Sequence, residues 1–271
     1  MGIASDIAGD WDAALAALAW QLDAGVDEVL SDSPVNRYDL PEAQPAPRPS
    51  AAAPAVQPRA AAPAPEPVRN AIDPVAVATA AASAARSLED LREAVSAFDL
   101  CELKKGARNT VFSDGNPAAR LLILGEAPGR DEDIEGRPFV GRAGQLLDRM
   151  FGAIGLSRQS PDAEAAFYIT NVMFWRPPGN RDPEPAEIAM MKPFVLRHIE
   201  LVDPQVIVVM GNTPLSCLTG HRGILRARGN WTEAVGRPML PMTHPAYLLR
   251  NPAAKREAWA DLLAIRERLR G

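Results

Sequence analysis

Three polar residues of the chain each follow a short apolar run: Glu126, Asn171 and His244. They offer a carboxylate, an amide and an imidazole, which can position water, pair with the edge of a planar ligand and donate a hydrogen bond. Each also has a plainer explanation: Glu126 could cap the following helix, Asn171 could lie in a turn, and His244 could be a satisfied core histidine. Because all three occupy the same position relative to an apolar run, we favour a shared site.

The residues around Glu126 form the glycine-rich segment Gly125–Leu147, with the sequence GEAPGRDEDIEGRPFVGRAGQLL. Its glycines indicate that the backbone approaches a ligand closely. The spacing matches neither the GxGxxG dinucleotide motif nor a P-loop, because no Gly-Lys-Ser/Thr follows. Phe139 stands in an otherwise Gly/Pro/Arg loop. An aromatic ring there is either a hydrophobic plug or a stacking platform for a planar ligand.

The elements that must position these residues are four strand-length apolar runs, at 121–124, 167–170, 206–210 and 239–242. Helical stretches separate the runs, which is typical of parallel strands buried on both faces. We therefore predict an α/β fold with three α/β/α layers around a four-stranded parallel sheet. The carboxyl ends of such strands form the ligand crevice, so the three polar residues are expected to converge there. The predicted helices span 143–152, 185–202, 214–219 and 255–268.

The N-terminal part of the chain has a different composition. Residues 1–40 are predicted to be a helical segment, with Trp11, Leu15, Leu18 and Leu22 at helical spacing within 8–24. That helix either packs on the main domain or docks a partner. Residues 41–72 read as a disordered linker, because proline and alanine dominate and little apolar surface can be buried. The predicted domain occupies 73–271 and begins with one helix over 74–98, for which Asp73 and Pro74 give the start signal.

Composition limits the classes of protein that fit. The chain has 271 residues, of which 47% are hydrophobic, and only two cysteines, Cys101 and Cys217. They stand far apart, so neither a disulfide framework nor a cysteine-rich metal site is indicated. No apolar run reaches the length of a membrane span, and the N-terminus lacks a secretory signal. We expect a cytoplasmic protein, without membrane association, that acts as a monomer.

The net charge of −5 is unevenly distributed along the chain. Residues 1–99 carry 15 acidic and six basic residues, a balance of −9, which leaves +4 for the remainder. Between Gln205 and Arg256 seven basic residues stand against one acidic residue, Glu233. The basic stretch is either a solvated face or a groove for a phosphate backbone.

Three ordered motifs carry a resemblance to a known family: GEAPGRDEDIEGRPFVGRAGQLLD, YITNVMFWRPPGNRDPEPAEI and THPAYLLRNPAAKREAW. Together they resemble the family 4 enzymes of the uracil-DNA glycosylase superfamily, over roughly residues 98–265. The resemblance implies a DNA repair enzyme that hydrolyses the N-glycosidic bond of uracil in DNA and leaves an abasic site. No lysine stands in the pocket motifs for a Schiff base, so a monofunctional enzyme is expected.

The resemblance also implies roles for individual residues. Phe139 would stack on the extruded base, Asn171 would read its edge, and His244 would lie against uracil O2. The backbone of the loop would line the uracil pocket at Glu126, Ala127, Pro128 and Gly129. DNA contacts would come from a loop that enters the vacated position and from the basic run, at Pro245, Ala246, Tyr247, Leu248, Arg250, Arg226 and Arg228.

The motifs leave open which residue activates the attacking water. In family 1 enzymes an aspartate stands one position after Glu126, where this chain has Ala127. Alanine cannot activate water, so Glu126 is the nearest replacement. Glu132 or Asp133 in the same loop could assist.

One feature departs from the family pattern. Family 4 enzymes hold a four-iron, four-sulfur cluster through four cysteines, and the corresponding positions here are Phe98, Cys101, Trp175 and Met191. One thiolate cannot hold a cluster that needs four ligands. We therefore expect no cofactor and an apolar plug at these positions. Two further possibilities stay open: a non-catalytic DNA-binding paralogue in replication or repair, and a glycosylase for another damaged base.

Overall fold

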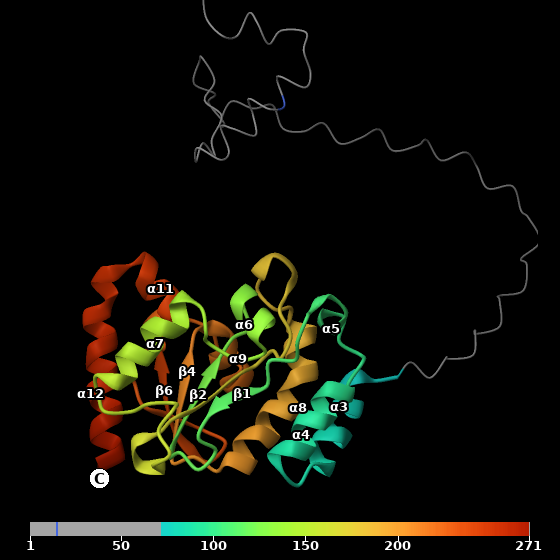
Figure 1. Cartoon of the computed structure of the whole chain (residues 1–271), viewed down its shortest axis with the longest axis horizontal. Coiled ribbons are helices and arrows are strands. Elements are labelled where there is room, and N and C mark those ends of the chain that lie inside the picture. The colour runs from blue at the N-terminus through green and yellow to red at the C-terminus, as the bar shows by residue number, and fades with distance from the viewer. Residues whose placement is uncertain (1–14, 16–71, 271) are drawn as a thin grey trace, which may run out of the picture. The chain divides into compact units, whose positions relative to one another are not determined.

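The computed structural model describes residues 72–270 and, in isolation, Leu15 (Figure 1). The predicted helix over 8–24 and the linker over 41–72 therefore lie outside the described residues, apart from Leu15 and Ile72. Within the described part, no helix is both long and apolar enough to cross a membrane.

A six-stranded sheet forms the centre of the domain, in the order β1-β3-β2-β4-β6-β5. The four central strands run parallel, as predicted: β2 (Leu121–Gly125), β3 (Tyr168–Asn171), β4 (Val206–Met210) and β6 (Arg237–Met242). The predicted strand count was too low, because two short antiparallel strands close the edges: β1 (Ser113–Gly115) and β5 (Thr232–Ala234). Each has three residues and little apolar content, so no hydrophobic pattern marks them.

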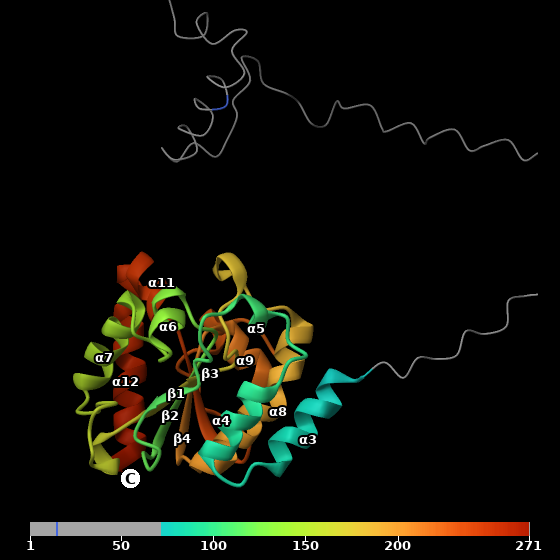
Figure 2. The same cartoon turned by 45° about the vertical axis from the view of Figure 1, so that its right-hand side comes forward.

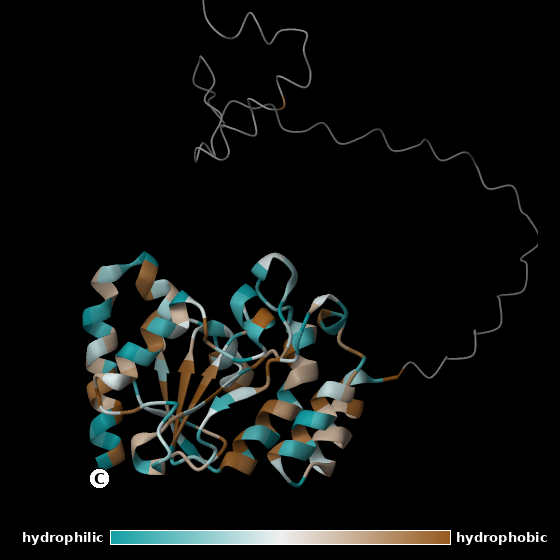
Figure 3. Ribbon diagram, viewed as in Figure 1, coloured by the Kyte–Doolittle hydropathy of each residue, from teal (hydrophilic) through white to brown (hydrophobic). Residues whose placement is uncertain are grey.

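The central strands are buried on both faces, which is why they read as continuous apolar runs. Alternate residues of one strand enter opposite cores: Leu122 and Leu124 face one cluster, whereas Leu121 and Ile123 face the other. Helices cover both faces (Figures 1 and 2). Hydrophobic residues dominate the central strands, whereas the surrounding helices carry both hydrophilic and hydrophobic residues (Figure 3). The predicted three-layer arrangement is confirmed.

The helices divide between the two faces. One core contains residues of α3 (Pro74–Ala84), α4 (Leu88–Ala97), α8 (Pro185–Val202) and α9 (Asn212–Thr219). The other contains residues of α7 (Arg142–Gly152), α11 (Pro245–Arg250) and α12 (Lys255–Arg270). Shorter elements connect them: α5 (Leu103–Gly106), α6 (Arg130–Glu135), α10 (Ile224–Ala227), η1 (Ala163–Ala165), η2 (Pro178–Asn180) and η3 (Pro252–Ala254).

The single helix predicted over 74–98 is wrong, because the chain breaks it into α3 and α4. Ser87 starts the second helix: its hydroxyl accepts from the backbone amide of Asp90, and the Asp90 carboxylate accepts from the amide of Ser87. This reciprocal cap satisfies two amides that a continuous helix would have paired differently. Both helices pack against α8. The predicted start of the first helix is confirmed by Asp73, which caps it.

The carboxyl ends of the four parallel strands point to the same edge of the sheet, at the top in Figure 1. The loops after β2, β3, β4 and β6 therefore meet there. Hydrogen bonds extend the pairing of β2 and β3 past the strand ends, from the amides of Val172 and Met173 to the carbonyls of Gly125 and Glu126. The first residues of these loops thus have fixed positions.

Candidate active site

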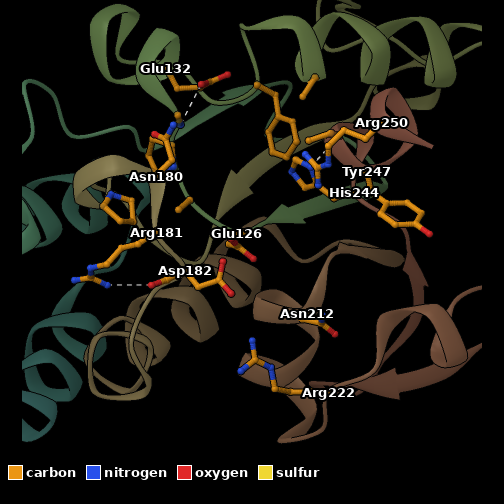
Figure 4. Close-up of a pocket in the computed structure, with 17 residues that line it drawn as sticks. Glu126, Glu132, Asn180, Arg181, Asp182, Asn212, Arg222, His244, Tyr247 and Arg250 are labelled. Carbon is orange, nitrogen blue, oxygen red and sulfur yellow. Dashed lines mark hydrogen bonds between the residues drawn. The ribbon is translucent and has the colours of Figure 1, made fainter. Parts of the chain in front are cut away.

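A pocket of about 540 Å³ lies at this edge, and residues from all four loops line it. The loop after β2 contributes Glu126 and the turn that follows it, and the chain after β6 contributes His244 and residues of α11 (Figure 4). The structure thus brings together most of the residues predicted for the base pocket. Those lining it are Glu126, Ala127, Pro128, Gly129, Phe139 and His244.

Asn171 is not among the residues that line the pocket, but it lies buried next to Gly125 and Phe139 at the pocket's edge of the sheet. Its residue is 1% exposed, and both amide atoms, Oδ1 and Nδ2, have no hydrogen-bond partner in the described part of the chain. Gly125 separates it from Phe139: a methyl group placed at Gly125 would lie 2.3 Å from Oδ1 of Asn171 and 2.5 Å from the Phe139 ring. Only glycine therefore allows the amide and the ring to approach each other here. An unpaired buried amide is costly, which is typical of a site that a ligand completes.

The Phe139 ring belongs to the wall of the pocket and is 6% exposed. Its backbone has a φ of 56°, a conformation that a bulky residue rarely adopts. Two contacts hold it there. The helix α7 comes so close that a methyl group at Gly144 would lie 1.7 Å from the Phe139 carbonyl oxygen. The same oxygen accepts a hydrogen bond from Nη2 of the buried Arg158 at 3.0 Å.

The two carboxylates proposed to assist Glu126 are committed to the backbone. Glu132 accepts hydrogen bonds from the amides of Gly129, Val140 and Gly141, at 2.9–3.1 Å. It thereby ties the start of α6 to the loop that carries Phe139. Asp133 accepts from the amides of Arg108 and Asn109, at 2.8 and 3.2 Å. The geometry therefore gives both side chains a structural role.

Glu126 itself does not cap the helix that follows it. That helix, α6, is capped by Glu132, whereas Oε2 of Glu126 accepts a hydrogen bond from the hydroxyl of Thr213 at 2.6 Å. Glu126 is half-buried and lines the pocket. Its carboxylate therefore lies between the ends of β2 and β4.

His244 caps α11 with its own side chain. Nδ1 accepts a hydrogen bond from the backbone amide of Ala246 at 3.1 Å. An acceptor at Nδ1 places the proton of the neutral ring on Nε2. Burial lowers the pKa of His244 to about 4, and the charge of Arg250 contributes in the same direction. The imidazole is therefore neutral at neutral pH and presents Nε2–H as a donor, with its ring centroid 5.4 Å from that of Phe139.

The segment predicted to enter DNA as a loop is the short helix α11. Two of its residues turn inward: Pro245 is buried and Leu248 is 0% exposed, within the core. These two are therefore not available to DNA in this conformation. Ala246, Tyr247 and Arg250 line the pocket instead (Figure 4).

The basic run divides into structural and pocket residues. Arg228 forms ion pairs with Asp261 and Glu257 of α12, which gives it a structural role in place of the predicted phosphate contact. Arg226 is exposed but does not line the pocket. Arg222, at the start of the same run, does line it (Figure 4).

Sequence reasoning missed the pocket residues in the loops after β3 and β4. In the loop after β3, Arg181 forms the anchoring contact: its guanidinium donates to both carboxylate oxygens of Glu187, at 2.7 and 3.0 Å. That pairing holds the pKa of Glu187 below its usual range. The sequence did offer a signal for these residues, because both loops follow strands that were predicted. The missed lining residues are Pro177, Asn180, Arg181, Asp182 and Asn212, whereas Arg222 belongs to the basic run for which phosphate contacts were predicted.

The four positions that correspond to cluster ligands are buried in one apolar core: Phe98, Cys101, Trp175 and Met191. The Phe98 ring packs edge-on against Phe194, and the indole of Trp175 donates to the hydroxyl of Thr110. Burial raises the pKa of the Cys101 thiol, which disfavours the thiolate that metal binding needs. Across residues 72–270 no group of three or more His, Cys, Asp or Glu side chains could hold a metal ion. These residues do not fit an iron–sulfur cluster.

Comparisons with known proteins converge on one family. Residues 112–263 match the family model described as the uracil DNA glycosylase superfamily. The chain is 40% identical to a type-4 uracil-DNA glycosylase of Thermotoga maritima over 167 residues, which cover 60% of this chain and 84% of the relative. It is 35% identical to the type-4 uracil-DNA glycosylase of Archaeoglobus fulgidus over 192 residues, or 67% and 92% of the two chains. A DNA polymerase of Bacillus phage SP01 is 32% identical over 150 residues, 55% of this chain and 16% of the polymerase.

Proposed function

Because this chain belongs to the uracil-DNA glycosylase superfamily, we propose that it removes uracil from DNA by hydrolysing the N-glycosidic bond, leaving an abasic site. The observation that carries the proposal is the Asn171 amide, buried with both atoms unpaired beside the Phe139 ring. Such an amide lacks only a planar partner with one donor and one acceptor on its edge. Uracil has that edge.

Base recognition follows from the orientation of this amide. Its NH2 group donates to uracil O4, and its oxygen accepts from N3–H. Cytosine presents the opposite pattern, an amino donor at C4 and an unprotonated N3, so it would leave buried groups unpaired. The base must first leave the DNA stack, which costs a few kcal/mol that pocket and backbone contacts offset. Phe139 stacks on the extruded ring.

The departing base is an anion with charge concentrated at O2. His244 donates from Nε2–H to that oxygen, since its Nδ1 is occupied as an acceptor by the Ala246 amide. A neutral donor fixed before the reaction stabilises developing charge without reorganisation. The low pKa of His244 fits this arrangement, because Nδ1 stays unprotonated and accepts from the Ala246 amide, which leaves the single ring proton on Nε2.

Water attacks the sugar cation that remains. Among the three candidate carboxylates of the loop after β2, Glu126 is the one available for positioning it, because Glu132 and Asp133 are bound to backbone amides. Phosphates of the DNA are contacted by Arg222 and Arg250, which line the pocket together with Ala246 and Tyr247. Such contacts provide affinity without sequence information, so binding weakens as salt increases.

We also propose that the protein works without an iron–sulfur cluster. Phe98, Trp175 and Met191 fill the positions of three ligands with buried apolar groups. The purified protein should therefore be colourless and free of iron. Replacing these three residues with cysteine supplies the matched comparison, and iron in the unmodified protein would contradict the proposal. A cytoplasmic location and a monomeric state stay predictions from sequence.

The test of the function uses an oligonucleotide with a single uracil, followed by alkali to cut at abasic sites. Strand scission is expected with the unmodified protein, and at a much lower rate with Asn171→Ala. A protein that binds this DNA but never yields scission is the non-catalytic paralogue. Oligonucleotides with other damaged bases at the same position determine whether uracil is the preferred substrate.

A further inference from the structure

One contact of the pocket has no role in the chemistry described so far. The hydroxyl of Thr213 lies 2.6 Å from Oε2 of Glu126, although the two residues stand 87 positions apart. Thr213 is in the first turn of α9, directly after β4, and is 2% exposed. An ionised carboxylate only accepts hydrogen bonds, so the threonine is the donor. The contact therefore joins the ends of two neighbouring strands through the proposed water-positioning group.

Thr213 uses its hydroxyl differently from other helical threonines of the chain. Thr79 in α3 and Thr219 in α9 both donate to the carbonyl four residues earlier, at 2.7 Å each. That local bond is the usual way for a helical threonine to satisfy its hydroxyl. Thr213 is the second residue of α9, so its helix has no earlier turn that could offer such a carbonyl, and its hydroxyl donates to Glu126. Its hydroxyl is directed at the carboxylate and not at its own helix.

The contact leaves the other oxygen of Glu126 available. Oε1 has no hydrogen-bond partner among residues 72–270, and Glu126 lines the pocket. Gly211, just before α9, lies close to both Glu126 and His244. A methyl group placed there would lie 4.0 Å from Oε2 of Glu126 and 3.9 Å from Cβ of His244. The carboxylate is thus held on the side of the pocket that His244 also borders.

We propose that Thr213 is a positioning residue for the glycosylase reaction, which fixes Glu126 by one oxygen so that the other holds the attacking water. This inference rests on the proposed function. A glutamate side chain has several freely rotating bonds, and holding it in one orientation before the reaction lowers the entropic part of the barrier. Because the hydrogen bond acts through Glu126, its loss should slow bond cleavage while the affinity for DNA stays the same.

The test compares Thr213→Val, which keeps the shape of the side chain but removes the hydroxyl, with Thr213→Ser, which keeps the hydroxyl. Thr219→Val is the matched control, because it removes a hydroxyl from the same helix away from Glu126. Excision is measured under single-turnover conditions, affinity with an abasic-site duplex, and folding by thermal unfolding. Thr213→Val should slow excision about tenfold, which is the effect expected for the loss of one hydrogen bond to a charged group. Thr213→Ser should restore most of the rate, and Thr219→Val should leave it unchanged.

A double-mutant cycle with Glu126→Ala separates positioning from general packing. In that background Thr213→Val should have no further effect on the slow residual excision. Normal excision by Thr213→Val, or an equal loss in both backgrounds, would overturn the inference although the unmodified protein removes uracil. Failure of the unmodified protein to remove uracil would instead overturn the proposed function, and the inference with it.

Discussion

The guanidinium of Arg158 donates a hydrogen bond to the carbonyl oxygen of Phe139 at 3.0 Å, and a second one to the neighbouring carbonyl of Pro138 at 2.8 Å. These bonds hold the backbone of Phe139 at its positive φ of 56°, a conformation that costs roughly 1–3 kcal/mol for such a residue. Asp114 and Asp148 pair with the same guanidinium. A buried arginine therefore determines where the stacking ring of the pocket lies.

Replacing Arg158 with methionine should reduce both stability and excision. The change leaves two carbonyls and the carboxylate of Asp148 without their donor, and Asp114 with Arg137 as its remaining cation, so the free energy of unfolding should decrease by about 2–3 kcal/mol. Arg137→Met is the matched control, since Arg137 pairs with Asp114 and Glu135 from an exposed position and should matter by less than about 1 kcal/mol. Urea denaturation at pH 7 measures both. Equal effects of the two substitutions would show that Arg158 does not support the loop.

Asn171→Ala separates stability from function. The substitution should abolish the discrimination that the amide provides and lower the excision rate by about 100-fold or more, since a polar partner of the base is lost. Its effect on folding should be small, within about 1 kcal/mol, because the amide has no partner to lose in the free protein. Excision assays and urea denaturation of the same preparation test both statements. A large loss of stability would mean that the amide is structural.

His244→Ala should lower the rate of bond cleavage by about 10²–10³, the effect of removing one donor from a site of developing negative charge. His244→Gln keeps an N–H donor and should retain more activity than alanine. Affinity for an abasic-site duplex, which lacks the base, should be similar for both variants. Equal rates for alanine and glutamine would exclude a donor role at this position.

The protonation state of His244 can be observed directly. Its pKa is lowered to about 4, so the ring should stay neutral from pH 8 down to about pH 5, with the proton on Nε2. Nitrogen chemical shifts of the imidazole distinguish the two neutral forms and the cation. A charged ring at pH 6 would contradict this assignment.

Acid stability should depend on His198, which is 0% exposed and lies 2.8 Å from the Tyr168 hydroxyl through Nε2. Burial lowers its pKa to about 3, and the charge of Arg92 adds to the effect. Between the unfolded value of 6.5 and about 3, the unfolded chain binds a proton that the folded protein does not. Stability therefore decreases as the pH falls through this range, by about 2 kcal/mol for His198 alone between pH 7 and pH 5.

The measurement for His198 is the difference in unfolding free energy between pH 7 and pH 5. The double substitution His198→Phe with Tyr168→Phe should reduce this difference by about 2 kcal/mol. Tyr168→Phe alone should keep it, and so supplies the control. His244 contributes in the same direction in every variant, because its pKa is also lowered. An unchanged difference in the double variant would assign the acid sensitivity to other groups.

The sequence by itself determined the central layer and the place of the site. The runs that became β2, β3, β4 and β6 are apolar throughout because both of their faces are buried, and this pattern is local. Parallel strands then place their carboxyl ends at one edge, so the convergence of Glu126 and His244 in one pocket followed from strand order alone. The apolar replacements at the cluster positions were equally visible as residue types.

The tertiary structure decided which partner each side chain uses. Glu132, Asp133 and Glu126 are carboxylates of one segment, and nothing local tells which of them remains free for water. The same holds for Arg228, which is bound to Asp261 far along the chain, and for Leu248, which turns into the core. Hydrophobic periodicity is set by near neighbours and can be read from a sequence. The partner of a polar group depends on residues that only folding brings within hydrogen-bond distance, as Thr213 and Glu126 illustrate.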